Sequence, residues 1–177
     1  RSDVYLNLGL PNVGLKLRNF DGSKGTLECK LRNKLTKDTG VTEHWVKFEL
    51  GKTVTLSGLD QIQNHVSNYE PVKQKNTWNT NKADILRALQ NEISLVAIAK
   101  NRFTVKGKKE KVSFSKAEVV SFSVTQIHPR KKKFGDFVSG SVSAKAQQQC
   151  QHAHLNLFAA DKVLVSGGYP AALMQIC

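Results

Sequence analysis

The sequence predicts a single α+β domain over residues 1–177, made mainly of antiparallel β-strands with one or more short helices. Three observations favour this fold class. Short segments of alternating apolar and polar residues recur along the chain, turn-forming sequences separate them at short intervals, and one stretch has helical spacing. A chain of 177 residues with 40% hydrophobic residues can bury the core of one domain.

The first third of the chain contains four predicted strands. They span residues 4–10, 13–18, 26–32 and 41–50. The turns between them are expected at Pro11-Asn12, Asp21-Gly22-Ser23 and residues 37–40. Turns at such spacing are typical of an antiparallel meander or barrel.

The middle of the chain is polar and only weakly periodic over residues 52–80. Residues 81–91 then place Ile85, Leu86 and Leu89 at helical spacing, so we predict a short helix there with Asn81 as its N-cap. Further strands are expected at residues 94–103, 118–127 and 137–147, with shorter strand-like segments at 154–158 and 162–165. Basic connections lie at residues 106–111 and 128–133.

The charge balance points to an anionic partner or to a lysine-rich surface. Lys and Arg number 27 against 14 Asp and Glu, which gives a net charge of +13.

The cysteines Cys29, Cys150 and Cys177 are odd in number and contain no CxxC pair, so neither a disulfide framework nor a zinc site is indicated. No apolar run approaches 18 residues, and a membrane span is not expected. We expect a cytoplasmic protein of undetermined oligomeric state, although the start at Arg1 leaves a removed leader open.

Pairs of basic residues at positions i and i+2 recur on three predicted strands. They are Lys16/Arg18, Lys30/Arg32 and Lys100/Arg102. Because side chains alternate between the faces of a strand, each pair points to one face, and six cations line one surface if the three strands share a sheet. That surface either binds an anion or is solvated.

Acidic residues share the face of these cations. Glu28 lies on the side of Lys30, and Lys47 and Glu49 share one face of the next strand. Arg supplies bidentate geometry for phosphate, Lys supplies point charge, and carboxylates hold a divalent metal that bridges phosphate oxygens. The alternative is an outer face on which cross-strand Glu–Lys pairs keep the sheet soluble.

Several segments, in their order along the chain, resemble the CYTH domain, also called the triphosphate tunnel metalloenzyme superfamily. They are RSDVYL, NVGLKLR, LECKLR, GVTEHWVKF, AIAKNRF, EVVSFSV and SGGYPAAL. The resemblance covers most of the chain. It implies an eight-stranded antiparallel tunnel, or barrel, in which basic residues grip a triphosphate or polyphosphate.

The resemblance also implies functional residues. Lys16, Arg18, Lys30, Arg32, Lys100 and Arg102 would bind the anion, and Glu28 and Glu118 would be the carboxylates available to Mg²⁺ or Mn²⁺ in phosphoanhydride hydrolysis. Two departures put hydrolysis in doubt. The family's E-x-E-x-K first strand has no counterpart from Arg1 onward, and Ala144 and Lys145 stand where the family tends to place a glutamate. We therefore expect a polyanion-binding protein whose enzymatic activity is undecided and whose catalytic residues are unassigned.

Two other functions remain open. One is a nucleic-acid-binding or structural module that uses exterior charge, including Pro129–Lys133 and Lys106, Lys108, Lys109 and Lys111. The other is a divergent enzyme that reuses the tunnel for an unrelated small ligand. An H-x-H pair, His152 and His154, lies near Cys150, and ordinary polar surface is favoured over a metal site there. Trp45 and Trp78 are interpreted as packing residues, and Cys29 as a core residue.

Overall fold

The computed structural model describes residues 1–36, 42–56, 58–106, 116–143 and 174. Within these residues the chain forms seven strands and two helices, which confirms the α+β class and the predominance of antiparallel strands. The strands are β1 (Ser2–Asn7), β2 (Val13–Arg18), β3 (Lys24–Thr36), β4 (Thr42–Thr55), β5 (Ser94–Lys106), β6 (Lys116–His128) and β7 (Lys132–Ser143). The helices are α1 (Leu59–Asn68) and α2 (Lys75–Leu89).

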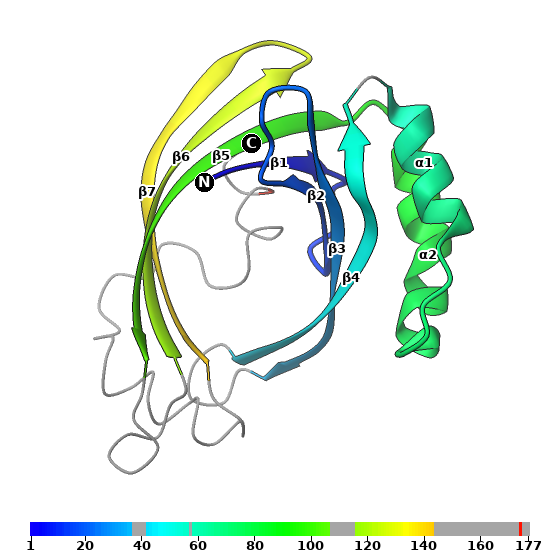
Figure 1. Cartoon of the computed structure of the whole chain (residues 1–177), viewed down its shortest axis with the longest axis horizontal. Helices are drawn as coiled ribbons and strands as arrows, with labels where there is room; N and C mark the ends of the chain where they lie inside the picture. The colour runs from blue at the N-terminus through cyan, green and yellow to red at the C-terminus, as the bar shows by residue number, and fades with distance from the viewer. Residues whose placement is uncertain (37–41, 57, 107–115, 144–173, 175–177) are drawn as a thin grey trace.

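The strands form one curved sheet in the order β4-β3-β2-β1-β5-β6-β7, and every neighbouring pair is antiparallel. Strand β1 lies at the centre and joins the β2–β4 half to the β5–β7 half. The sheet has a concave face and a convex face (Figure 1). Its end strands β4 and β7 do not pair with each other in the described residues, so these seven strands form an open sheet.

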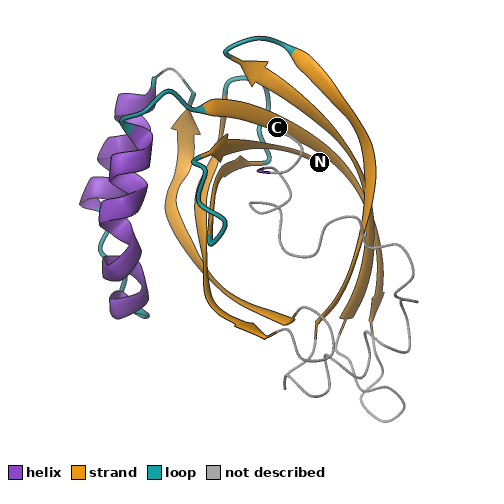
Figure 2. Ribbon diagram, turned by 180° about the vertical axis from the view of Figure 1, so that it is seen from behind, coloured by secondary structure: helices purple, strands orange, loops and turns teal. Residues whose placement is uncertain are grey.

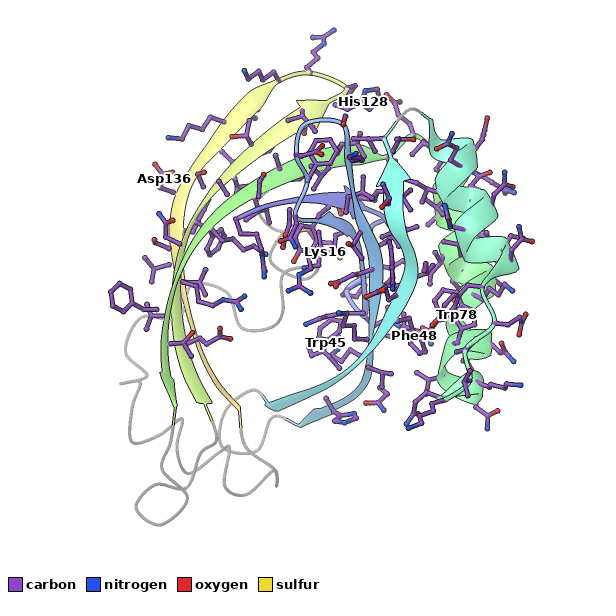
Figure 3. The ribbon with its side chains drawn as sticks, in the orientation of Figure 1. Lys16, Trp45, Phe48, Trp78, His128 and Asp136 are labelled. Atoms are coloured by element: carbon purple, nitrogen blue, oxygen red, sulfur yellow. The ribbon has the colours of Figure 1, made fainter. Side chains whose placement is uncertain are left out.

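Both helices lie against the convex face over β3 and β4 (Figure 2). The apolar residues of β2 and β3 alternate onto this face, where Leu15, Leu17 and Leu27 are fully buried. Trp78 of α2 is also fully buried, and its ring centroid lies 5.1 Å from those of both Phe48 and Tyr69. Figure 3 shows Phe48 and Trp78 facing each other between β4 and α2. Trp78 and Cys29 are therefore core residues, as predicted.

A second apolar cluster lies on the concave face of the other half of the sheet. Its buried members come from β1, β5 and β6: Tyr5, Val96, Ile98, Val120, Phe122 and Val124. The register places Ile98 opposite Val124 and Phe122 opposite Phe137, whose ring stacks on Phe122 at 5.7 Å. The concave face is thus charged along β2–β4 and apolar along much of β5–β7.

The helical region differs from the prediction. Helix α1 was not predicted, because residues 59–68 are mostly polar and only Ile62 and Val66 are buried. Helix α2 begins at Lys75, and Asn81 lies in its interior instead of capping it. The Asn81 amide donates a hydrogen bond to the Thr77 carbonyl (2.8 Å) and accepts one from Asn12 Nδ2 (3.1 Å). The prediction of Asn81 as an N-cap was therefore wrong. Asparagine is a common N-cap residue, and nothing in the local sequence indicated that Asn81 would pair with the distant Asn12.

The observed strands lie where they were predicted, but several of them differ from the prediction in length. Strand β2 has the predicted bounds, whereas β3 and β4 extend further at both ends or at the C-terminal end. Strand β1 ends at Asn7, shortly before Gly9, which has a φ of +67°. The Asp21 turn forms as expected, since its Oδ1 accepts 2.9 Å hydrogen bonds from the amides of Ser23 and Lys24.

Some predicted segments lie outside the described residues. They include strand-like residues 154–158 and 162–165, the end of the strand predicted at 137–147, and most of the basic connection at 106–111. Strand β7 itself begins at Lys132, inside the basic sequence that was predicted to be a connection.

Replacing Trp78 with Ala should destabilise the fold by about 3–5 kcal/mol, since it removes a fully buried aromatic side chain between the sheet and α2. Urea unfolding measures this free energy. Val72→Ala is the matched control, because that side chain is 92% exposed and its loss should change stability by less than about 0.5 kcal/mol. Equal effects of the two substitutions would contradict the assignment of Trp78 to the core.

Candidate functional site

The three basic pairs come from β2, β3 and β5, and all of them lie on the concave face. Their burial varies. Lys16 and Lys100 are buried, Arg18 and Arg32 are half-buried, and Lys30 and Arg102 are exposed. Figure 3 shows Lys16 and Trp45 on the inner side of the curved sheet and Phe48 on the side of the helices. The alternation argument therefore placed these cations on the correct face.

Asp3 of β1 is the centre of this charged surface. Its side chain is fully buried, and Oδ2 accepts hydrogen bonds from Lys16 Nζ and Lys100 Nζ, both at 3.0 Å. Arg1 Nε lies 3.2 Å from Oδ1. One carboxylate thus joins strands β1, β2 and β5. Asp3 was not among the site residues predicted from the sequence. Its alternation with Tyr5 along β1 was the pattern that could have placed it on the face of the cations.

Tyr5 lies between the two buried lysines. Lys100 Nζ donates a hydrogen bond to the Tyr5 hydroxyl at 3.2 Å. The ammonium groups of Lys16 and Lys100 also lie 5.4 Å and 5.0 Å from the centroid of the Tyr5 ring. The aromatic face therefore adds cation–π stabilisation to two ammonium groups that share one carboxylate.

Burial and pairing shift the pKa values of this group. Burial lowers the pKa of Lys100 to about 8, and the Asp3 charge offsets only part of that effect. The pKa of Lys16 is lowered for the same reason. Burial alone would raise the pKa of Asp3, but the charges and hydrogen bonds of Lys16 and Lys100 outweigh it and hold that pKa well below its usual value.

Glu28 of β3 is the second acidic centre. It lies 2.7 Å from Lys47 Nζ, 3.1 Å from Arg18 Nη1 and 3.8 Å from Lys16 Nζ. Burial would raise its pKa, yet the hydrogen bonds from Lys47 and Arg18 lower it. Glu28 is therefore an ionised carboxylate surrounded by three cations.

Glu118, the other predicted metal ligand, forms an ion pair with Arg102, whose Nε lies 2.9 Å from Glu118 Oε1. Both predicted ligands thus already bind basic side chains. In the part of the chain that the structure describes, no group of three or more His, Cys, Asp or Glu residues is arranged to hold a metal ion. Ala144, Lys145, His152 and His154 lie outside the described residues, and the Mg²⁺ or Mn²⁺ assignment stays a prediction.

Lys30 differs from the other cations of the concave face. It reaches solvent and has no ion-pair partner among the described residues. Its cross-strand neighbour is another cation, Lys47. Burial and repulsion from Lys16, Lys47 and Arg102 lower the pKa of Lys30, and attraction to Glu28 offsets only part of this effect. An anion would therefore improve the electrostatic environment of Lys30.

Arg32 and Trp45 complete the charged surface. The Arg32 guanidinium carbon lies 5.8 Å from the Trp45 ring centroid, and the two residues are cross-strand neighbours. Trp45 was predicted to be a packing residue, and it packs against this arginine on the concave face instead of joining the core under the helices.

The exterior basic sequence Pro129–Lys133 spans the connection from β6 to β7 and the first two residues of β7. Arg130 and Lys131 are exposed, whereas Lys133 pairs with Asp136 at 3.0 Å. Across the described residues, no helix has the length and apolar character needed to cross a membrane.

No protein-family model, curated protein or solved structure matches this chain. The resemblance to CYTH domains therefore stays a prediction, and the function has to be inferred from the concave face.

Asp3→Asn should destabilise the protein by about 3–5 kcal/mol, because it leaves Lys16 and Lys100 buried without their counter-charge. Urea unfolding at neutral pH provides the measurement. Asp136→Asn removes an exposed ion pair and should cost less than about 1 kcal/mol. If Asp3→Asn cost no more than this control, Asp3 would not organise the site.

Acid should destabilise the wild-type protein through Asp3. Its folded-state pKa lies below the ordinary value of 3.8, so the unfolded state binds more protons as the pH falls. The contribution is complete above the ordinary pKa and is lost progressively below about pH 5. Unfolding free energies measured across this range should fall more steeply for wild type than for Asp3→Asn; parallel curves would exclude Asp3 as a main titrating group.

Proposed function

We propose that the protein binds a small polyanion, such as a triphosphate or a short polyphosphate, on the concave face of its sheet. The observation that supports this most directly is Lys30, an exposed cation that forms no ion pair in the described residues and whose charged neighbours are three cations and one carboxylate, Glu28. A sheet surface that served only solubility would pair this lysine with a carboxylate across the strands. Here its cross-strand partner is Lys47.

The surrounding residues suit a phosphate-rich ligand. Lys30 and Lys47 supply point charges, and Arg102 and Arg32 supply guanidinium groups with planar donor geometry. Repulsion from Arg102 contributes to the lowered pKa of Lys30, although their strands are separated by β1 and β2, and this supports a ligand that contacts both residues. A ligand with several negative charges can contact both halves of the charged surface, whereas a single anion cannot neutralise it.

The proposal requires that the protein binds a polyanion, and it does not require that the protein hydrolyses one. Glu28 and Glu118 are engaged by basic side chains, so a divalent metal would have to compete with those contacts. The closed eight-stranded tunnel implied by the CYTH resemblance is also not required, since the concave face of the seven described strands carries the same cations. Metal-dependent hydrolysis is a separate hypothesis, tested by phosphate release from tripolyphosphate and ATP with Mg²⁺ or Mn²⁺.

Lys30→Glu should weaken tripolyphosphate binding at least ~10-fold, because it replaces an attractive charge with a repulsive one. Isothermal titration calorimetry with a chelator present measures metal-free binding. Lys131→Glu is the matched control, with the same charge change in the exposed β6–β7 connection. If Lys131→Glu weakened binding and Lys30→Glu did not, exterior charge would be responsible, as in the nucleic-acid-binding alternative.

Lys30→Met separates a functional cation from a structural one. The lowered pKa of Lys30 means that its charged form is disfavoured in the fold, so removal of the charge should leave the melting temperature unchanged or raise it. Tripolyphosphate affinity should fall in the same variant. A loss of stability that accompanies the loss of binding would instead assign Lys30 a structural role.

A further inference from the structure

Strand β4 is an end strand of the sheet, and one of its edges has no neighbouring strand among the described residues. Within the described residues, residues 46–54 of this strand pair with β3 alone, which leaves the other edge without a neighbouring strand. A long open edge is a site at which another strand adds by continuing the ladder. The chemistry of the edge then selects which strand fits.

Charged residues of β4 lie opposite like charges on β3. Glu49 is paired in register with Glu28, and Lys47 with Lys30. Lys47 resolves this by reaching diagonally to Glu28 at 2.7 Å. Glu49 is exposed and forms no ion pair with any described residue. Its carboxylate therefore lacks a cation on the β3 side and is free to accept one on the open side.

The order of residues along β4 is complementary to itself when reversed. If two copies of β4 pair antiparallel about Phe48, Lys47 of each copy faces Glu49 of the other. Val46 then faces Leu50 on the convex side. The charged pairs lie on the concave side and the apolar pairs on the convex side, since residues directly opposite each other share a face. A one-residue shift of this register would lose both charge pairs.

A pocket lies between β4 and α1. It has a volume of about 380 Å³ and is lined by Leu50 of β4 together with Gln61, Asn64, His65, Asn68, Tyr69 and Glu70. Gln63 of α1 donates a hydrogen bond to Leu89 of α2, so that side of α1 faces α2. By helical geometry Gln61, Asn64 and Asn68 lie on the side of α1 away from Gln63, and all three line the pocket. This side of the helix presents amide groups to a neighbouring molecule.

We infer that the open edge of β4 pairs with β4 of a second copy of this chain, which gives a two-fold symmetric dimer with a continuous sheet. The polar sides of the two α1 helices then lie next to each other over the paired strands. Such an interface is isologous, so each Lys47–Glu49 contact occurs twice. The concave faces of both copies point to the same side, which doubles the cationic surface available to a polyanion.

Charge reversal at the paired positions tests the register. Wild type should sediment at twice the monomer mass of 19.6 kDa in analytical ultracentrifugation at micromolar concentrations. Glu49→Lys and Lys47→Glu should each raise the dimer dissociation constant at least ~100-fold, since each places like charges opposite at two contacts. Mixing the two variants should restore a dimer with one copy of each, detected by native mass spectrometry. Glu92→Lys, an exposed change outside β4, should leave the wild-type dimer intact.

The Lys47→Glu variant also loses the ion pair with Glu28 within each copy, so a second measurement uses the wild-type protein alone. Amide hydrogen exchange in wild type should slow over residues 46–54 as concentration rises, while exchange in β7 stays constant. A wild-type monomer at all concentrations would overturn the inference. A dimer that Glu49→Lys leaves unchanged, or one whose protection appears along β7, would overturn it equally.

Discussion

The contact of Asp3 with two buried lysines is the constraint on which the charged face depends. Strand β1 is the central strand, and its only neighbours are β2 and β5. Lys16 and Lys100 come from these two neighbours and meet on the same carboxylate oxygen. Neither ammonium group could be buried without Asp3, and Asp3 could not be buried without them, because an unpaired charge in the interior is far too costly. The three strands therefore hold a fixed lateral arrangement on the concave side.

Among the described residues, the buried cluster contains more positive than negative charge. Its one carboxylate, Asp3, binds two lysines and also contacts Arg1. Glu28 lies next to this cluster and likewise contacts several cations. Lys30 adds a further cation to this surface, and attraction to Glu28 offsets only part of the repulsion from its cationic neighbours. A cationic surface with its acidic groups already used is suited to hold an anion and poorly suited to bind a divalent metal.

The two faces of the sheet divide stability from binding. On the convex side, Leu15, Leu17 and Leu27 pack under the helices with Trp78 and supply the apolar burial that stabilises the fold. On the concave side the same strands present charges that cost free energy to arrange. Strand β4 belongs to both regions and ends the sheet, so its Lys47 and Glu49 can take part in the charged surface and in association between copies. Ligand binding and dimer formation would then share one strand.

The sequence by itself determined which residues share a face. Alternation at a period of two placed the Lys16, Lys30 and Lys100 pairs on one side of their strands and Leu15, Leu17 and Cys29 on the other, because this pattern depends only on local backbone geometry. The tertiary structure alone decided the rest. Asp3 became the centre of the site because β2 and β5 meet at β1, and the lone Lys30 resulted from the register that sets it opposite Lys47. Helix α1 and the true start of α2 were equally hidden, since burial of a few residues against the sheet outweighs weak local propensity. Strand order, register and curvature arise from contacts between residues distant in sequence, and no local pattern contains them.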